Sequence, residues 1–215
     1  LINALQSKKT AKSLFYNSRV YTLLAINKTT LIMKKALIGS LVGGLLIFIW
    51  QTLSWTVMDL HRPAQDYTPK QDTIMAFLNA TLEKEGGYYI PNTPSGTSME
   101  ESTKQAEKMQ GKPWATIQYH KSLQMDSSTM FMNMGRGFVV NVIIAWMVCW
   151  MISKMKTPSF ITVLLVNIFI GCIVFLNVPY TGFIWYKTFD LTAHLTDALV
   201  SWALCGAWLG WWLRR

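Results

Sequence analysis

Seven side chains that we expect on the outer side of a membrane could bind a metal ion through imidazole or thioether groups. They are His61, His120, His194, Met125, Met130, Met132 and Met134. Imidazole and thioether ligands together suit Cu(I), so these residues are our candidate copper ligands. Packing at a membrane surface is the alternative, because methionine commonly fills irregular gaps there. A zinc site is disfavoured, since neither His-x-x-x-His nor Cys-x-x-Cys spacing occurs.

A second group of polar side chains lies within or beside long apolar stretches of the sequence. Ionisable groups at membrane depth are costly and are usually paired. Arg136 and Asp197 fall at similar depths beside two such stretches, and Asp59 follows a third. We therefore predict that Arg136 pairs with Asp197 or Asp59 and holds helices together. A proton or ion relay is the alternative, although the stretches lack the central breaks typical of transporters.

The sequence lacks the short motifs of the common enzyme classes. It contains no glycine-rich phosphate loop, no Gly-x-Ser-x-Gly and no His-Glu-x-x-His. Cys149, Cys172 and Cys205 fall in three different apolar stretches, where a free cysteine behaves as a small hydrophobic residue. We therefore predict a non-enzymatic protein with no catalytic residues and no cofactor, and a membrane-embedded enzyme is the remaining alternative.

Four apolar stretches are the elements that must position these residues. They cover residues 36–58, 138–152, 159–178 and 195–213. Roughly 20 apolar residues cross a bilayer core of about 30 Å, so the sequence predicts a mainly α, four-helix transmembrane bundle. Three spans with one re-entrant or buried segment is the alternative, because the stretch that includes residues 138–152 is short for a span.

The charged residues predict how these spans are oriented. Segments 1–35, 153–158 and 214–215 contain eleven Lys and Arg residues and no Asp or Glu. Since Lys and Arg next to a span stay in the cytoplasm, we expect both termini inside a bacterial inner membrane and residues 59–136 outside. The net charge of +9 does not indicate nucleic-acid binding, because no basic stripe alternates with stacking aromatic residues.

Small residues predict how the spans pack. Gly39 and Gly43 in the first apolar stretch, and Gly206 and Gly210 in the fourth, have the spacing that lets helix backbones approach closely. We expect the first and fourth spans to pack within one bundle, with homodimer formation as the alternative. Residues 1–32 are expected to be a non-native or disordered upstream segment, and residues 33–58 an uncleaved signal-anchor and first span.

Residues 59–136 have the pattern of a small α+β cap. The signals are a helix opening at Thr68-Pro69, a strand at 88–90, a capping box at 98–101 that opens a second helix, and a strand at 114–120. We predict that the strands pair and that the cap is compact and leans on the bundle. The aromatic segment 178–193 is interpreted as an interfacial belt, or as part of a lipid- or ligand-contacting groove beneath the cap.

Several short motifs resemble those of a loose group of short, uncharacterised, four-span bacterial inner-membrane proteins. They are Gly43-Gly44, Trp50, Ser54-Trp55, Gly135-Arg136-Gly137, Asp197, Ser201-Trp202 and the Gly-Trp-Trp-Leu ending. The resemblance implies an inner-membrane location and four spans, but no activity. The predicted function is an envelope protein whose cap (59–136) and aromatic loop engage a partner protein or lipid. A small transporter or metal-handling protein, using the outer His and Met residues or the Asp197 region, is the alternative.

Overall fold

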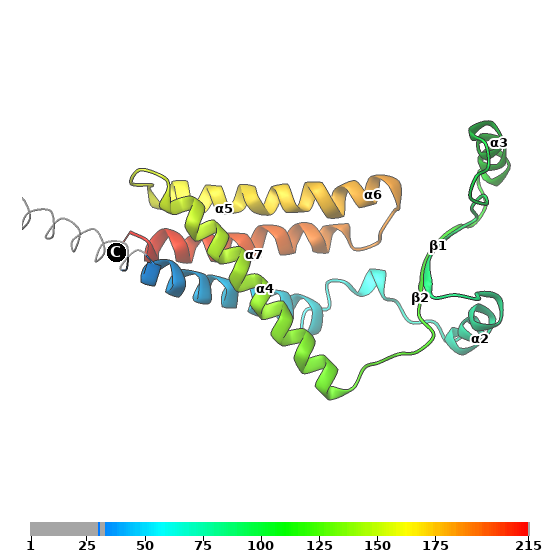
Figure 1. Ribbon diagram of the computed structural model, residues 1–215, viewed down its shortest axis with the longest axis horizontal. Helices are drawn as coiled ribbons and strands as arrows, with labels where there is room; N and C mark the ends of the chain where they lie inside the picture. Colours follow the sequence, from blue (N-terminus) through cyan, green and yellow to red (C-terminus); the bar gives the residue numbers. More distant parts are fainter. Residues whose placement is uncertain (1–29, 31–32, 215) are drawn as a thin grey trace, which may run out of the picture.

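The computed structural model describes residue 30 and residues 33–214, and it is mainly helical (Figure 1). The upstream segment predicted for residues 1–32 therefore lies outside the described residues, apart from residue 30. Long helices run side by side at one end of the molecule, and a small sheet with two short helices stands at the other (Figure 1).

Three helical stretches are long and apolar enough to cross a membrane. They are Met33–Thr56, which we call the first helix, α4 (Ser127–Ser153), and the stretch Phe160–Trp185. The third stretch comprises α5 (Phe160–Phe175), a π-helical turn η2 (Leu176–Tyr180) that includes Pro179, and α6 (Thr181–Trp185). These lengths and compositions identify a membrane protein. The last helix, α7 (Leu191–Trp212), lies outside this set of three.

Two of the predicted boundaries are wrong. Helix α4 begins at residue 127 rather than 137, because Asp126 caps it by accepting a hydrogen bond from the backbone N–H of Thr129 at 2.6 Å. Residues 127–136 therefore belong to a long helix and not to the cap. Similarly, residues 178–185 continue the helical stretch begun by α5 instead of forming a loop.

Helix α7 is the centre of the bundle and buries more residues than any other described helix. On one side it lies against the first helix, where the indole N–H groups of Trp208 and Trp212 donate to the carbonyls of Gly39 (3.1 Å) and Lys35 (2.8 Å). The first and fourth apolar stretches are thus neighbours. The glycines of α7, however, contact α5 and not the first helix: a Cβ at Gly206 would lie 2.7 Å from Cβ of Asn167.

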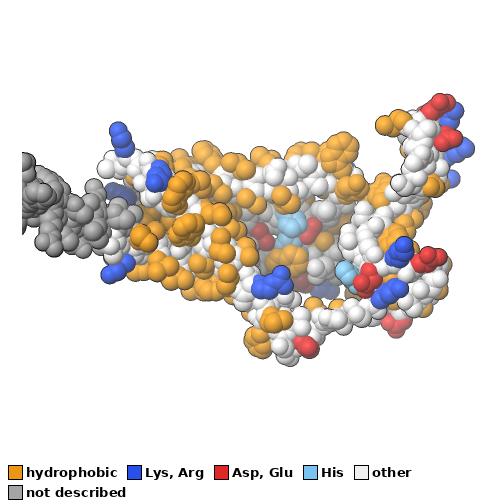
Figure 2. Space-filling view, in the orientation of Figure 1, with side chains coloured by type: hydrophobic (Ala, Val, Ile, Leu, Met, Phe, Trp, Pro, Cys, Tyr) orange, Lys and Arg blue, Asp and Glu red, His pale blue; other side chains and the backbone are white. Residues whose placement is uncertain are grey.

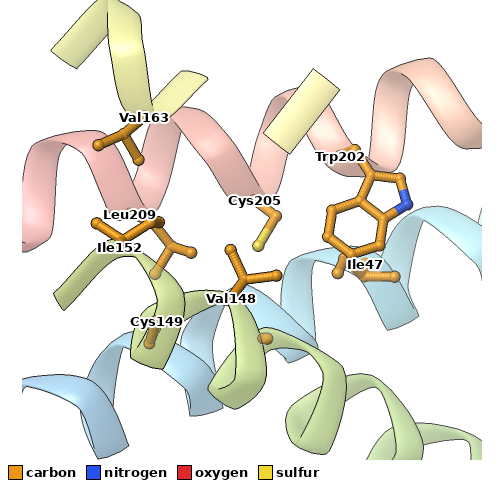
Figure 3. Packing of buried hydrophobic residues seen from close by; sticks show 9 residues of the cluster. Ile47, Val148, Cys149, Ile152, Val163, Trp202, Cys205 and Leu209 are labelled. Atoms are coloured by element: carbon orange, nitrogen blue, oxygen red, sulfur yellow. The ribbon is translucent and has the colours of Figure 1, made fainter. Parts of the chain in front are cut away.

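The apolar core lies where four helices meet. Ile47 comes from the first helix, Val148 from α4, Val163 from α5, and Cys205 and Leu209 from α7 (Figure 3). The first helix and α4 approach closely at Gly44, where an added Cβ would lie 2.7 Å from the backbone of Val142. This core ties the helices into one unit, and large apolar side chains on their outer faces stay exposed (Figure 2).

Residues between the first helix and α4 fold in the predicted helix-strand-helix-strand order. After a 3-10 turn η1 (Arg62–Ala64) come α2 (Gln71–Thr81), β1 (Gly86–Ile90), α3 (Met99–Met109) and β2 (Ala115–Tyr119). The strands pair antiparallel with Tyr88 opposite Ile117. Ser98 caps α3 by accepting a hydrogen bond from the N–H of Glu101 at 3.3 Å, as the capping box predicts. Helix α2 ends at Thr81, and Gly86 and Gly87 open β1.

The predicted compactness of this cap is wrong. Helices α2 and α3 contain no buried residue, and they stand at opposite ends of the hairpin (Figure 1). Tyr119 is buried, and its hydroxyl donates to Oδ1 of Asn79 at 2.8 Å, which fixes α2 to the sheet. The ring of Tyr89 meets that of Tyr186 at 5.7 Å, and this contact joins the hairpin to the loop after α6.

Candidate functional site

A buried histidine shared by two carboxylates is the most unusual feature of the structure. His61 is 2% exposed and Asp190 is 5% exposed. Nδ1 of His61 lies 2.8 Å from Oδ2 of Asp190, and its Nε2 lies 3.0 Å from Oδ2 of Asp197. Both ring nitrogens are therefore engaged. Histidine and acidic side chains gather between apolar surfaces near the end of the bundle that faces the cap (Figure 2).

Helix α7 positions three members of this cluster. Asp190 immediately precedes its first residue, and His194 and Asp197 follow at spacings of four and three residues, which places all three on one helix face. Nε2 of His194 lies 3.3 Å from the same Oδ2 of Asp190 that contacts His61. The carboxylate oxygen of Asp190 is thus the point on which two imidazoles converge.

The end of the first helix positions His61. The chain reverses at Asp59, which has a φ of 49°, so His61 returns over the preceding helical turn. There its ring stacks on that of Trp55, with centroids 3.9 Å apart and planes inclined by 8°. The edge of the His61 ring also meets His194 at 4.8 Å. Stacking on one side and hydrogen bonds at both nitrogens fix the imidazole in a single orientation.

A tryptophan of the first helix holds Asp197 in place. The indole N–H of Trp50, on the first helix, donates to Oδ1 of Asp197 at 3.0 Å, while Oδ2 faces His61. Both carboxylate oxygens therefore have partners. This arrangement meets the requirement that a charged group inside a helical bundle be compensated by neighbours.

The surroundings favour the charged forms of His61 and Asp190. Burial would lower the pKa of His61, but hydrogen bonds to Asp190 and Asp197, together with their negative charges, outweigh burial and raise that pKa. Burial would raise the pKa of Asp190, but the hydrogen bond with His61 and the charge of His194 lower it overall. The contacts between His61 and Asp190 therefore stabilise the charged form of each group relative to burial alone.

A pocket of about 580 Å³ adjoins the cluster between the first helix, α4, α5 with η2, and α7. Its walls are mainly apolar, and its polar groups come mostly from the side of the first helix and α7. The lining includes Trp55, Met130, Val174, His194, Asp197 and Ser201. Pockets of about 300–1,000 Å³ with apolar walls and a few polar groups are typical of small-molecule sites.

The structure brings together only part of the predicted copper-binding set. His61 and His194 belong to the cluster, and Met130 and Met134 line the pocket. His120 is exposed after β2, and Met125 and Met132 are exposed outside the pocket. Within the described residues, the ligand atoms of His61, Asp190 and His194 converge.

The predicted pairing of Arg136 with Asp197 or Asp59 is wrong. Asp197 is engaged by His61 and Trp50, and Asp59 lies 3.5 Å from Arg62. No ion pair of Arg136 occurs in the part of the chain that the structure describes. The chain turns after the first helix, which sequence periodicity does not reveal. His61 therefore lies beside Asp197, where Arg136 was expected.

Asp190 and Trp50 are the site residues that sequence reasoning missed. In the sequence, Trp50 is noted only among the motifs that carry the resemblance, and Asp190 only as one position of the aromatic segment 178–193. The spacing Asp190-x-x-x-His194-x-x-Asp197 was the available signal, because it places three ionisable groups on one face of a helix.

Comparison with protein-family models, with curated proteins and with solved structures finds no match for this chain. The function must therefore be argued from the cluster and its adjoining pocket.

Proposed function

We propose that the protein crosses a bacterial inner membrane four times, with α7 as the fourth span, both termini in the cytoplasm and the cap outside. The absence of acidic residues from segments 1–35, 153–158 and 214–215 supports this orientation. Helix α7 contains His194, Asp197 and several Trp and Gly residues, and it is not among the three stretches with the hydropathy expected of a span. Its central position shields these groups from lipid.

We further propose that the protein is a non-enzymatic binding protein for a lipid of the surrounding bilayer. The acyl chain would occupy the apolar part of the pocket, and the polar head would reach His194, Asp197 and Ser201. The observation that carries this proposal is the combination, in one pocket between membrane helices, of apolar walls and a polar corner.

The pocket is open to the surroundings of the helices, because several of its apolar wall residues are exposed. Trp55, Met130 and Val174 line it and are 44%, 51% and 47% exposed. In a membrane, the molecules that meet such exposed apolar walls are lipids. Contact between the acyl chain and the apolar wall gives little preference for one lipid over another, because lipid tails and apolar side chains are chemically alike.

Selectivity must therefore come from the head group. His194 and Asp197 offer hydrogen-bonding groups at the depth where a polar head meets the acyl region. Asp197 already contacts His61 and Trp50, and His194 contacts Asp190 through Nε2. A carboxylate oxygen can accept a second hydrogen bond, and the other ring nitrogen of His194 can bond to a head group, so both residues keep further hydrogen-bonding positions. A lipid whose head satisfies them would bind in preference to its neighbours.

A pair of glycine substitutions on α4 tests this proposal. Gly137 lines the pocket, and the nearest atom to an added Cβ, on Phe48, is 3.9 Å away, so Gly137→Leu can fill the pocket without a backbone clash. Gly135 lies outside the pocket, and an added Cβ meets nothing within 4 Å, so Gly135→Leu is the matched control. Native mass spectrometry of protein extracted in mild detergent measures the lipid that each variant retains.

We expect the wild type and Gly135→Leu to retain a lipid and Gly137→Leu to lose it. A loss of about 1.4 kcal/mol in binding corresponds to about tenfold lower retention. Equal retention by both variants, at unchanged melting temperature, would contradict the assignment of this pocket.

A further inference from the structure

We infer that His61, Asp190 and His194 bind a divalent transition-metal ion of the zinc class. One ligand atom from each residue lies within 4.8 Å of the other two. Two of these separations are shorter: Oδ2 of Asp190 is 2.8 Å from Nδ1 of His61 and 3.3 Å from Nε2 of His194. Three groups that commonly act as ligands thus face one point.

The ligand set matches the chemistry of such ions. Two imidazoles with one carboxylate bind Zn²⁺ in catalytic zinc sites and Fe²⁺ in non-haem iron sites. Zinc ligands at about 2.0–2.2 Å from the metal are about 3.4 Å from one another in a tetrahedron. The 3.3 Å separation between Asp190 and His194 is near this value, and the His194 side chain is 35% exposed and has room to rotate. The 2.8 Å separation between Asp190 and His61 is a hydrogen-bond length, which must open by about 0.6 Å when a metal takes the place of the proton.

The second layer of contacts is also that of a metal site. A histidine that ligates a metal through one ring nitrogen usually donates its other N–H to a carboxylate, which fixes the tautomer. With Nδ1 of His61 toward the metal, Nε2 faces Oδ2 of Asp197 at 3.0 Å. Trp50 in turn holds the other oxygen of Asp197. This chain of contacts extends from the proposed ligand into the first helix.

The second histidine favours a metal over a simple ion pair. One imidazolium between Asp190 and Asp197 would satisfy both carboxylates without His194. Yet His194 also points its Nε2 at Asp190, and it lines the pocket, whereas His61 and Asp190 are buried. Three protein ligands leave a coordination position open, as catalytic zinc sites do. The inference stands on this geometry and does not depend on the lipid that the pocket holds.

Metal analysis of the full chain in detergent tests the inference. The protein is stripped with a chelator, loaded with Zn²⁺ or Co²⁺, freed of excess ion and measured by mass spectrometry for bound metal. We expect about one ion per chain for the wild type, as one three-ligand site predicts. His194→Ala removes a ligand at a half-exposed position and should abolish stoichiometric binding.

His120→Ala is the matched control, because His120 is exposed and lies outside the cluster. It should bind metal like the wild type, and the visible spectrum of bound Co²⁺ should change in Asp190→Asn but not in His120→Ala. Melting temperatures check that each variant is folded. Absence of metal from the wild type, or equal binding by folded His194→Ala, would overturn the inference. Gly137→Leu should keep its metal, so failure of the lipid proposal is distinguishable.

Discussion

Removing the indole donor of Trp50 should destabilise the bundle by an amount that the structure allows us to estimate. In Trp50→Phe an aromatic ring remains, but the N–H that donates to Oδ1 of Asp197 at 3.0 Å is lost. Hydrogen bonds to charged groups contribute about 1.5–3 kcal/mol. Asp197 has only 16% of its side chain exposed, so water replaces the lost donor poorly. We expect the free energy of unfolding to fall by about 2 kcal/mol.

The assay is reversible unfolding in mixed micelles. Far-ultraviolet circular dichroism monitors it, because that signal reports helix content and not the tryptophan side chains. Trp146→Phe is the matched control, because Trp146 lies on α4 with half of its surface exposed. A substitution away from buried contacts should change stability by no more than about 0.5 kcal/mol. If the two variants were equally stable, Trp50 would not hold Asp197, and our account of the site would be refuted.

The same substitution should weaken the proposed metal site. Removal of a second-layer partner commonly lowers metal affinity by about 10–100-fold. Trp50→Phe should therefore raise the dissociation constant for Zn²⁺ while keeping one ion per chain at saturation. Unchanged Zn²⁺ affinity in a destabilised Trp50→Phe protein would show that this hydrogen bond plays no part in metal binding.

Two further predictions concern packing and topology. Gly44→Ala should lower the melting temperature, because the added Cβ would lie 2.7 Å from the backbone of Val142. Overpacking costs about 1–3 kcal/mol, which exceeds the gain of about 1 kcal/mol in helix propensity when alanine replaces glycine. Gly135→Ala, in open space, should not lower it, and a reversed order of the two variants would contradict the helix contact. In a background with the native cysteines replaced by alanine, a membrane-impermeant thiol reagent should modify Ser95→Cys in intact spheroplasts but Lys156→Cys only after permeabilisation. The opposite pattern would refute the proposed orientation.

Local patterns in the sequence predict local structure well in this protein. The capping box at Ser98 locates the start of α3, and the alternation at 114–120 locates β2, because both signals act between residues close in the chain. The apolar stretches locate the helices for the same reason. The start of α4 was missed because residues 127–136 mix polar and apolar side chains, and the capping aspartate lies well before the apolar run.

The site itself could be predicted only in part, because it depends on contacts between distant segments. Asp197 and His194 are recognisable as ionisable groups beside an apolar stretch. Their partner His61 lies more than 120 residues away and arrives through the chain reversal at Asp59. We predicted Arg136 as the partner because it lies at a similar depth in the sequence pattern and has the opposite charge. The structure instead uses an imidazole that can ionise and is held by stacking on Trp55.

The central position of α7 has a consequence for how the protein is made. During translation the first helix, α4 and α5 enter the membrane before α7 is synthesised, and each is apolar enough to insert by itself. Until α7 arrives, His61 and Trp50 lack the carboxylates that they contact in the finished molecule. The site is therefore completed last, by the helix that we propose as the fourth span and that is not among the three most apolar stretches. We expect membrane quality control to recognise chains interrupted before α7, so that molecules lacking the site do not accumulate.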